Sequence, residues 1–316
     1  MVFGATACSG KSDSKQPAAS SSATQSDVKP SPFDADSAFS YVAAQTAFGP
    51  RVPGTKAHAE CVDYIVAMLR RAGGVVELQD TVMVNPKGEK VSVRNISARF
   101  RPEAPTSVLL AAHYDSRPRA DMDPDEANHA KPIDGANDGA SGVGVILELV
   151  RHIDRLPEGL GIEVAILDAE DNGDYESDDA LWCIGSQAWA AHNASRVNLP
   201  LYGILLDMVG GRDARFHREY FSERYARQVL DHVWSAAQRA GYGDRFPQQT
   251  GGAINDDHIY IMQAGVPCID IVESVNPSTG SFNPTWHTLD DTIENIDPAT
   301  LKAVGDVVFE ALAGMK

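Results

Sequence analysis

The chain has 316 residues, of which 43% are hydrophobic, and this is enough for one large domain with a full core. Its 27 basic and 44 acidic side chains give a formal net charge of −17. This balance argues against nucleic acids and anionic membranes as main partners, because both would be repelled. Cationic ligands such as peptide amino termini would be modestly attracted.

Cysteine spacing and hydropathy exclude two further classes. The four cysteines form no Cys-x-x-Cys pair, so neither a thiolate zinc site nor a redox motif is indicated. We expect Cys61, Cys183 and Cys268 to be small buried hydrophobes. No apolar run reaches the roughly 18 residues that are needed to span a bilayer.

Residues 1–32 differ in composition from the rest of the chain. Small residues precede Cys8, and a tract rich in Ser, Ala, Gln and Lys follows it. The pattern resembles a bacterial lipoprotein processing site, although no hydrophobic signal region precedes it and Ala5 stands where a large apolar residue is usual. We predict a lipoprotein signal remnant and a disordered linker, export to the periplasm or outer membrane of a bacterium, and membrane contact only through Cys8. The alternative is a disordered tail with an incidental cysteine.

Helices and strands alternate from residue 33 onward. The patterns predict, in chain order, helices 33–48 and 55–72, a hairpin of strands 75–84 and 91–100, strand 107–112, helix 139–153, strand 162–167, helix 182–192, strand 201–209, helices 222–240 and 256–263, strand 266–272 and helix 298–313. This order predicts one α/β domain over 33–316, with a mixed, mostly parallel central sheet and helices on both faces. The polar segment 116–137 is a long loop, and loops of that length in a compact domain are usually functional or disordered.

The segment from Val164 to Asp171 is central to the functional interpretation. It begins as a buried strand and ends in the adjacent acids Glu170 and Asp171. Two such carboxylates are costly to bury unless a cation or a proton compensates them. In open α/β sheets, binding sites form beyond the carboxyl ends of the strands. A solvated acidic corner is the alternative for this stretch taken alone.

Other predicted strand ends also carry polar side chains. His113 and Asp115 follow one strand, Asp207 ends another, and His287 comes later in the chain. Each has a simple structural explanation by itself, such as a helix cap or a core histidine. Their joint position at the ends of successive strands favours one shared site.

A glycine-dense turn, 135–144, leads into a predicted helix and carries Asp138. Such turns can bind phosphate at a helix start, but this one lacks the lysine of a nucleotide-binding loop and the spacing of a dinucleotide fingerprint. Asp138 would also repel phosphate. Carboxylate and imidazole groups without thiolate are the ligands of catalytic zinc.

These residues carry a family resemblance. His113-x-Asp115, then Asp138-Gly-x-Ser-Gly, an acidic pair, an Asp and a His resemble the co-catalytic zinc aminopeptidase family. Three further segments are similar to glutaminyl-peptide cyclotransferases (glutaminyl cyclases) of the animal-like bacterial type: 206–211, 255–258 and 282–297. The resemblance runs from about Gly49 to the C-terminus and implies the zinc exopeptidase-like fold.

The resemblance also implies roles for individual residues. One zinc per chain would be held by Asp138, Asp171 and His287, and Glu170 would be the general acid/base. Asp207 and Asp256 would form a hydrogen-bonding carboxylate pair, and the pocket walls would be Trp182, Phe282 and Trp286. The animal enzymes have Glu at the position of Asp171, so the choice of Glu170 or Asp171 as metal ligand stays open.

The implied reaction converts the N-terminal glutamine of a peptide or protein into pyroglutamate and releases ammonia. The substrate's own amine is the nucleophile, so one metal is enough, whereas an aminopeptidase activates water with two. His113 could hold a second zinc together with Asp138 and Asp207, so a dinuclear zinc aminopeptidase of the same fold is the alternative. A non-catalytic lipoprotein binding module is a third hypothesis.

Overall fold

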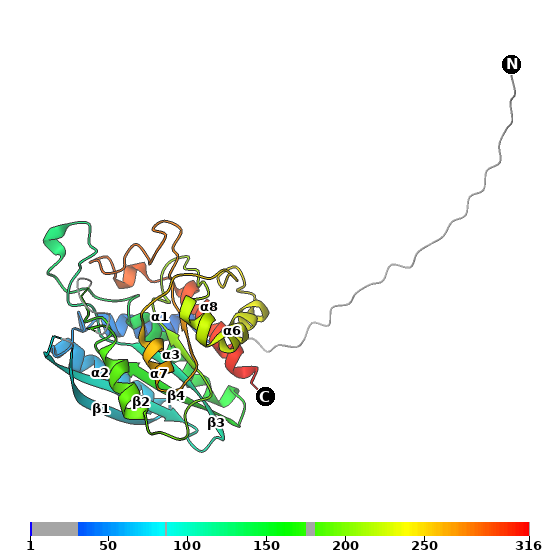
Figure 1. Ribbon diagram of the computed structural model, residues 1–316, viewed down its shortest axis with the longest axis horizontal. Coiled ribbons are helices and arrows are strands. Elements are labelled where there is room, and N and C mark those ends of the chain that lie inside the picture. The colour runs from blue at the N-terminus through cyan, green and yellow to red at the C-terminus, as the bar shows by residue number, and fades with distance from the viewer. Residues whose placement is uncertain (2–30, 86, 175–180, 316) are drawn as a thin grey trace. The chain divides into compact units, whose positions relative to one another are not determined.

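A mixed six-stranded sheet lies at the centre of the computed structural model, which describes residues 1, 31–85, 87–174 and 181–315 (Figure 1). The strand order is β1-β2-β4-β3-β5-β6. β1 and β2 form an antiparallel hairpin, β2 is antiparallel to β4, and β4, β3, β5 and β6 are parallel. The strands are β1 Val75–Val84, β2 Lys90–Phe100, β3 Thr106–His113, β4 Leu160–Leu167, β5 Gly203–Leu206 and β6 Cys268–Ile271. The predicted mixed, mostly parallel sheet is therefore confirmed.

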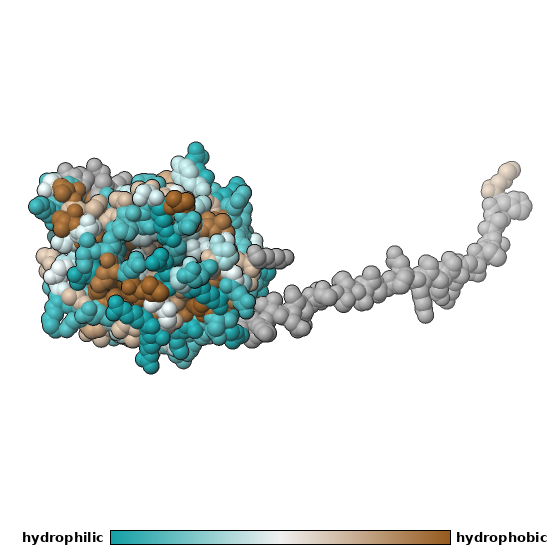
Figure 2. Space-filling view, turned by 90° about the horizontal axis from the view of Figure 1, so that it is seen from below, coloured by the Kyte–Doolittle hydropathy of each residue, from teal (hydrophilic) through white to brown (hydrophobic). Residues whose placement is uncertain are grey.

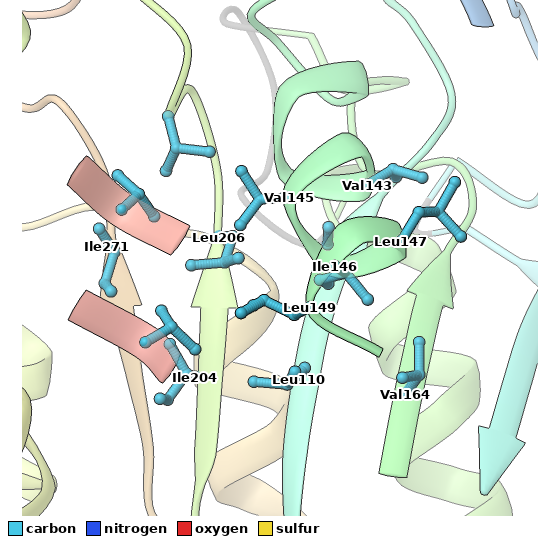
Figure 3. Close-up of a cluster of buried hydrophobic side chains, with 14 of the residues drawn as sticks. Leu110, Val143, Val145, Ile146, Leu147, Leu149, Val164, Ile204, Leu206 and Ile271 are labelled. Carbon is cyan, nitrogen blue, oxygen red and sulfur yellow. The ribbon is translucent and has the colours of Figure 1, made fainter. Parts of the chain in front are cut away.

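Helices cover both faces of the sheet. They are α1 Ala35–Thr46, α2 Lys56–Arg71, α3 Ala140–Leu149, α4 Ile184–Asn193, α5 Tyr220–Tyr225, α6 Arg227–Ala240, α7 Asp257–Gln263 and α8 Pro298–Ala313, with short 3-10 helices at Glu126–Asn128, Val150–Arg155 and Ile293–Asn295. Alternate strand residues face opposite ways, so Leu110 joins the core beneath α1, α2, α3, α6 and α8, whereas Leu109 packs with α4 and α7. Figure 3 shows side chains of α3 and of the parallel strands gathered in the first core.

Helix ends follow local sequence signals. The Asp34 side chain accepts a hydrogen bond from the Asp36 N–H at the start of α1, and Thr55 caps α2 in the same way through the N–H of His58. Pro298 occupies the first turn of α8, where its missing N–H removes no helix bond. Gly241 ends α6 with a φ of 85°, a conformation that glycine adopts without strain.

Three predicted elements differ most from the structure. The helix predicted over 139–153 is α-helical only to Leu149 and continues as the 3-10 helix Val150–Arg155. The strand predicted over 201–209 is shorter, because Met208 has a φ of 50° and turns the chain after Asp207. The helix predicted over 222–240 is two helices, separated at Ala226, whose φ of −130° lies outside the helical region. Hydrophobic periodicity continues across such a break, so the sequence pattern did not show it.

The strand order creates a switch point beside β3. The chain goes from β3 to β4 on one side and then crosses to β5 on the other side. In sheets of this kind the crevice outside the carboxyl ends of the strands is where ligands bind. His113 is the last residue of β3, so this edge is the expected place for a site.

The surface agrees with the charged composition. The face in Figure 2 is mostly hydrophilic, with apolar residues in separate patches. Among the described residues, no helix is both long and apolar enough to cross a membrane. Ser31–Lys316 forms one compact unit. Cys8 lies outside the described residues, as does most of the predicted linker 1–32, so the lipid anchor and the export remain predictions.

Candidate active site

The predicted functional side chains lie around one pocket beyond the carboxyl ends of β3, β4 and β5. The pocket has a volume of about 480 Å³. Its lining includes every residue that the sequence predicted as catalytic, metal-binding or wall-forming: Asp138, Glu170, Asp171, Trp182, Asp207, Asp256, Phe282, Trp286 and His287. Segments up to 149 residues apart in the sequence are thus brought together by the sheet.

Unusual backbone turns aim several of these side chains. Ala169, Met208 and His287 have φ values of 51°, 50° and 54°, in the left-handed region that non-glycine residues rarely adopt. Ala169 lies directly before Glu170, and Met208 directly after Asp207. Such outliers persist where the surrounding structure fixes them, and they cluster at functional sites.

His287, Asp138 and Asp171 form a cluster suited to a metal ion. One ligand atom from each lies within 4.8 Å of the others. The Nε2 of His287 is 3.0 Å from Asp171 Oδ1 and 3.3 Å from Asp138 Oδ2. Burial alone would lower the pKa of His287, but these two carboxylates outweigh burial and raise the pKa to about 9. Protons thus compensate the buried acids where no cation does.

The backbone around Asp138 is held in place by the carboxylate of Asp291. The N–H groups of Asn137 and Asp138 donate to the two carboxylate oxygens of Asp291, at 2.7 and 3.1 Å. Directly after Asp138, at the N-cap of α3, a side chain on Gly139 would lie 2.8 Å from the Asp115 carbonyl and 2.9 Å from the His113 ring, and the φ of Gly139 is 92°. Glycine is therefore needed for the close approach of this turn to β3.

Glu170 lies next to the metal-type cluster but outside it. Burial raises the pKa of its carboxyl well above the usual range; His113 opposes the rise, and the neighbouring Asp171 and Asp256 add to it. The thiol of Cys183 donates to Glu170 Oε1 at 3.3 Å. A buried carboxyl with a raised pKa beside an open pocket is suited to moving a proton near neutral pH.

His113 forms a second cluster that shares Asp138. Its Nε2 lies 3.0 Å from Asp138 Oδ1 and 3.2 Å from Asp207 Oδ1, and its Nδ1 lies 3.4 Å from Asp115 Oδ1. Asp115 also accepts the backbone N–H groups of Glu170 and Asp171, at 3.1 and 3.2 Å. Asp115 therefore connects the end of β3 to the acidic turn after β4.

Asp207 and Asp256 lie on the opposite wall of the pocket. Burial and repulsion from Asp138 and Asp256 raise the pKa of Asp207 to about 7, although the His113 hydrogen bond opposes this. Burial, and after it repulsion from Asp256, raises the pKa of Asp270 of β6 well above its usual range. Asp207 and Asp256 are thus coupled by repulsion across the pocket, and the shared-proton role expected for them remains a prediction.

Aromatic rings form the remaining walls. The Trp182 ring is nearly parallel to the His287 ring, with centroids 6.1 Å apart, and Trp286 lies against the same imidazole at 4.0 Å. Phe282 packs on Trp286 at 4.4 Å. The buried carboxylate of Glu273 anchors this segment by accepting from the side chains of Asn276 and Asn283. The result is a pocket with acids at its base and rings at its sides.

Sequence reasoning missed several residues that support the site. Asp291 was visible only within a segment used for its resemblance, and Cys183 was interpreted as a plain buried thiol. Asp270 lies inside a strand that reads as apolar. Arg117 and Asp121 belong to the long loop, where no periodicity marks individual residues.

Comparison with known proteins agrees with this geometry. The model of peptidase family M28 matches residues 95–312. The crystal structure of Bacteroides thetaiotaomicron glutaminyl cyclase bound to N-acetylhistamine is 44% identical, with 91% of this chain and 100% of that chain covered and a TM-score of 0.87. A leucine aminopeptidase precursor from Bacteroides thetaiotaomicron is 43% identical, with 92% and 100% covered and a TM-score of 0.86. Bovine glutaminyl-peptide cyclotransferase is 27% identical over 82% of this chain and 76% of its own length. The chain belongs to peptidase family M28 and, within it, to the bacterial glutaminyl cyclases.

Proposed function

We propose that this protein is a zinc-dependent glutaminyl-peptide cyclotransferase that acts on N-terminal glutamine of peptides and proteins. The observation that carries the proposal is the position of Glu170 beside the Asp138–Asp171–His287 cluster, in a pocket walled by aromatic rings. The family and the glutaminyl cyclase relatives support the same activity.

The donor set fits one zinc ion. Two carboxylates and one imidazole with an open side toward a pocket are typical of catalytic zinc. Asp171 Oδ2 is buried with no hydrogen-bond partner among the described residues, and a buried carboxylate oxygen in that state is costly unless a cation or a proton compensates it. Asp171 falls in the histidine cluster, whereas Glu170 groups with Cys183 and Asp256. This supports Asp171 as the ligand and Glu170 as the proton carrier.

The reaction closes a five-membered lactam. The substrate's α-amine forms a bond to its side-chain amide carbon, the carbon–nitrogen bond of the amide breaks, and ammonia leaves. Bound zinc would supply a Lewis acid for the amide oxygen. Glu170 would accept the proton that the amine loses and give it to the departing nitrogen, so the protein's proton balance is restored in each turnover.

The pocket walls contribute orientation. A well-aligned intramolecular attack can reach an effective molarity of roughly 10⁵ M or more. Trp182, Trp286 and Phe282 would hold the glutamine side chain curled toward its own amine and keep water away from the amide carbon. The acids on the opposite wall, Asp207 and Asp256, also line the pocket and would orient the departing nitrogen.

A dinuclear zinc aminopeptidase is the second candidate. His113, Asp138 and Asp207 form another group whose ligand atoms lie within 4.8 Å of one another, and one similar structure is of a leucine aminopeptidase precursor. Two ions sharing Asp138 would activate water for peptide hydrolysis.

Two substrates and a metal count separate the candidates. The zinc-loaded protein is incubated with Gln-2-naphthylamide and with Leu-p-nitroanilide, and bound zinc is counted by elemental analysis. We expect ammonia release from the first substrate, no cleavage of the second, and one zinc per chain. Two zincs with hydrolysis of the leucine substrate would identify the aminopeptidase. A Glu170→Gln variant with unchanged activity would favour the non-catalytic binding module.

Export and lipid anchoring are a separate proposal that depends on Cys8. Small residues before this cysteine and the polar tract after it support the proposal. Expression in a bacterium of the wild-type gene with its natural upstream region, next to a Cys8→Ser variant, tests it. We expect the wild-type protein in the membrane fraction with an acylated N-terminus and the variant without acylation.

A further inference from the structure

The long loop after β3 is bonded to the segment that carries His287. The N–H of Met122 donates to the His287 carbonyl at 3.1 Å, and Asp123 Oδ2 accepts from the N–H of Leu289 at 3.0 Å. The family-based assignment of the site uses no residue of this loop. Its attachment to both sides of a proposed metal ligand suggests that the loop has a role there.

Asp121 is the loop residue nearest to the His287 ring. Its Oδ1 lies 3.6 Å from Nδ1, on the side of the imidazole opposite to the Nε2 that faces Asp138 and Asp171. Histidines that bind a metal through one nitrogen almost always donate the other N–H to a carboxylate, a carbonyl or water, which fixes the tautomer and the orientation of the ring. Asp121 occupies the place of that carboxylate.

The side chain of Arg117 holds the carboxylate of Asp121 in place. Its guanidinium is fully buried and forms a two-pronged pair, with Nε 2.8 Å from Asp121 Oδ1 and Nη2 2.5 Å from Oδ2. Paired geometry of this kind is specific to arginine and carboxylate. The pair is a rigid support because a buried guanidinium without its carboxylate would be costly.

The same guanidinium contacts two further parts of the site. Nη1 donates to the backbone carbonyls of Asp171 at 2.9 Å and Gly173 at 3.2 Å. The guanidinium carbon lies 4.6 Å from the centre of the Trp182 ring, within the range of a cation–π contact. One arginine therefore links the support of His287, the backbone of Asp171 and an aromatic wall.

We propose that Arg117 and Asp121 are positioning residues for the metal centre. The Asp121 carboxylate, 3.6 Å from Nδ1, attracts the Nδ1–H of His287 and so holds Nε2 toward Asp138 and Asp171. Arg117 holds Asp121 and the backbone of Asp171 in place. The inference rests on the metal site of the proposed function. The simpler alternative is an ion pair that stabilises the loop alone, without effect on the metal.

Zinc affinity measured without substrate distinguishes the two. Asp121→Ala and Asp121→Asn are compared with Asp125→Ala, a matched change in the same loop, where Asp125 caps the 3-10 helix Glu126–Asn128. The dissociation constant is measured by chelator competition, and the Tm is measured for the metal-free proteins. Removal of such a carboxylate typically weakens metal binding 10- to 100-fold, and we expect this for Asp121→Ala. The Asn variant should bind more tightly than the Ala variant because its amide oxygen still accepts, and Asp125→Ala should match the wild type.

Other outcomes would overturn the inference. If Asp121→Ala does not fold, the Asn variant carries the test. Zinc binding weakened more than twofold supports the inference, because a neutral amide attracts the Nδ1–H less than a carboxylate does, and affinity within twofold of wild type contradicts it. A lower Tm of metal-free Asp121→Ala with unchanged zinc affinity identifies the loop ion pair. Zinc binding by a wild-type protein that lacks cyclase activity would reject the proposed function alone. A wild-type protein that binds no zinc would reject both.

Discussion

Two buried clusters share Asp138, and they look alike at first. Each has one histidine and two aspartates whose ligand atoms lie within 4.8 Å of one another. Each histidine also has a carboxylate near its Nδ1: Asp121 at 3.6 Å from His287, and Asp115 at 3.4 Å from His113. By residue type alone, both could bind zinc.

Their surroundings differ. His287 lines the pocket between aromatic rings, and beside it a carboxylate oxygen of Asp171 lacks a hydrogen-bond partner among the described residues. His113 lies beneath the pocket, fully buried, and its Nε2 is hydrogen-bonded to Asp207. The histidine of the first cluster therefore faces the pocket and can reach a ligand there, whereas the histidine of the second does not line the pocket. The difference favours one metal over two.

The largest expected effect is the loss of zinc when the histidine of one of the two clusters is removed. We expect His287→Ala to lose zinc and activity, because only two carboxylates would remain as ligands in the open cluster. His113→Ala should keep its zinc, because the metal is held by the other cluster. Elemental analysis of both purified variants provides the measurement. Loss of zinc from the His113 variant and retention in the His287 variant would reverse the assignment.

Replacement of Glu170 by Gln comes next. Loss of a positioned general acid/base typically lowers kcat by roughly 10² to 10⁴, and zinc should stay bound because Glu170 lies outside the His287 cluster. Since burial raises the pKa of Glu170 well above the usual range, wild-type activity should increase with pH toward neutrality as its base form is populated. A pH–rate profile of the variant should lack this step, and persistence of the step would assign it to another group.

Metal removal should change how stability depends on pH. The pKa of Asp207 is about 7 against 3.8, and that of His287 is about 9 against 6.5. The folded, metal-free protein thus binds more protons than the unfolded chain, and its stability decreases as pH rises. The ionisation of Asp207 lowers the free energy of unfolding between about pH 4 and 7. The stabilisation from protonated His287 is complete below its unfolded pKa and is lost as the pH rises toward 9.

Thermal melts between pH 5 and 9 test this. We expect a falling Tm for the metal-free protein. Zinc-loaded protein should show a smaller decrease, because the metal requires deprotonated His287 and replaces its proton, whereas Asp207 lies outside this ligand set. Parallel curves for the two forms would show that His287 is not a metal ligand.

A wall residue should have the smallest effect. Trp182→Ala removes a ring that lies parallel to His287, and aromatic contacts of this type contribute roughly 0.5–1.5 kcal/mol. We expect a KM for the glutamine substrate raised by roughly tenfold or less, with one zinc still bound. Steady-state kinetics with zinc analysis measure both. Loss of zinc in this variant would make Trp182 part of the metal support and not only a wall.

The features of this molecule that follow a regular sequence pattern could be predicted from the sequence. Buried strands that end in acids located Glu170 and Asp207, and alternation of helices and strands gave the layers. The repulsion between Asp256 and Asp270 could not be predicted, because Asp270 lies in a short apolar strand whose pattern predicts burial but not the neighbouring residue. Asp121 was equally hidden, since loop residues meet their partners through tertiary folding, with no period to indicate which side chain turns inward.

The left-handed backbone at Ala169, Met208 and His287 implies that the stability of the fold and the orientation of the functional groups oppose each other. Each such residue costs of order 1–3 kcal/mol, so the protein gives up stability at the points where its functional groups are aimed. Glycine relieves this conformation but leaves the unfolded chain freer. Selection for a more heat-resistant variant would therefore tend to relax these turns first, and the gain in robustness would come with poorer alignment of the groups that they carry.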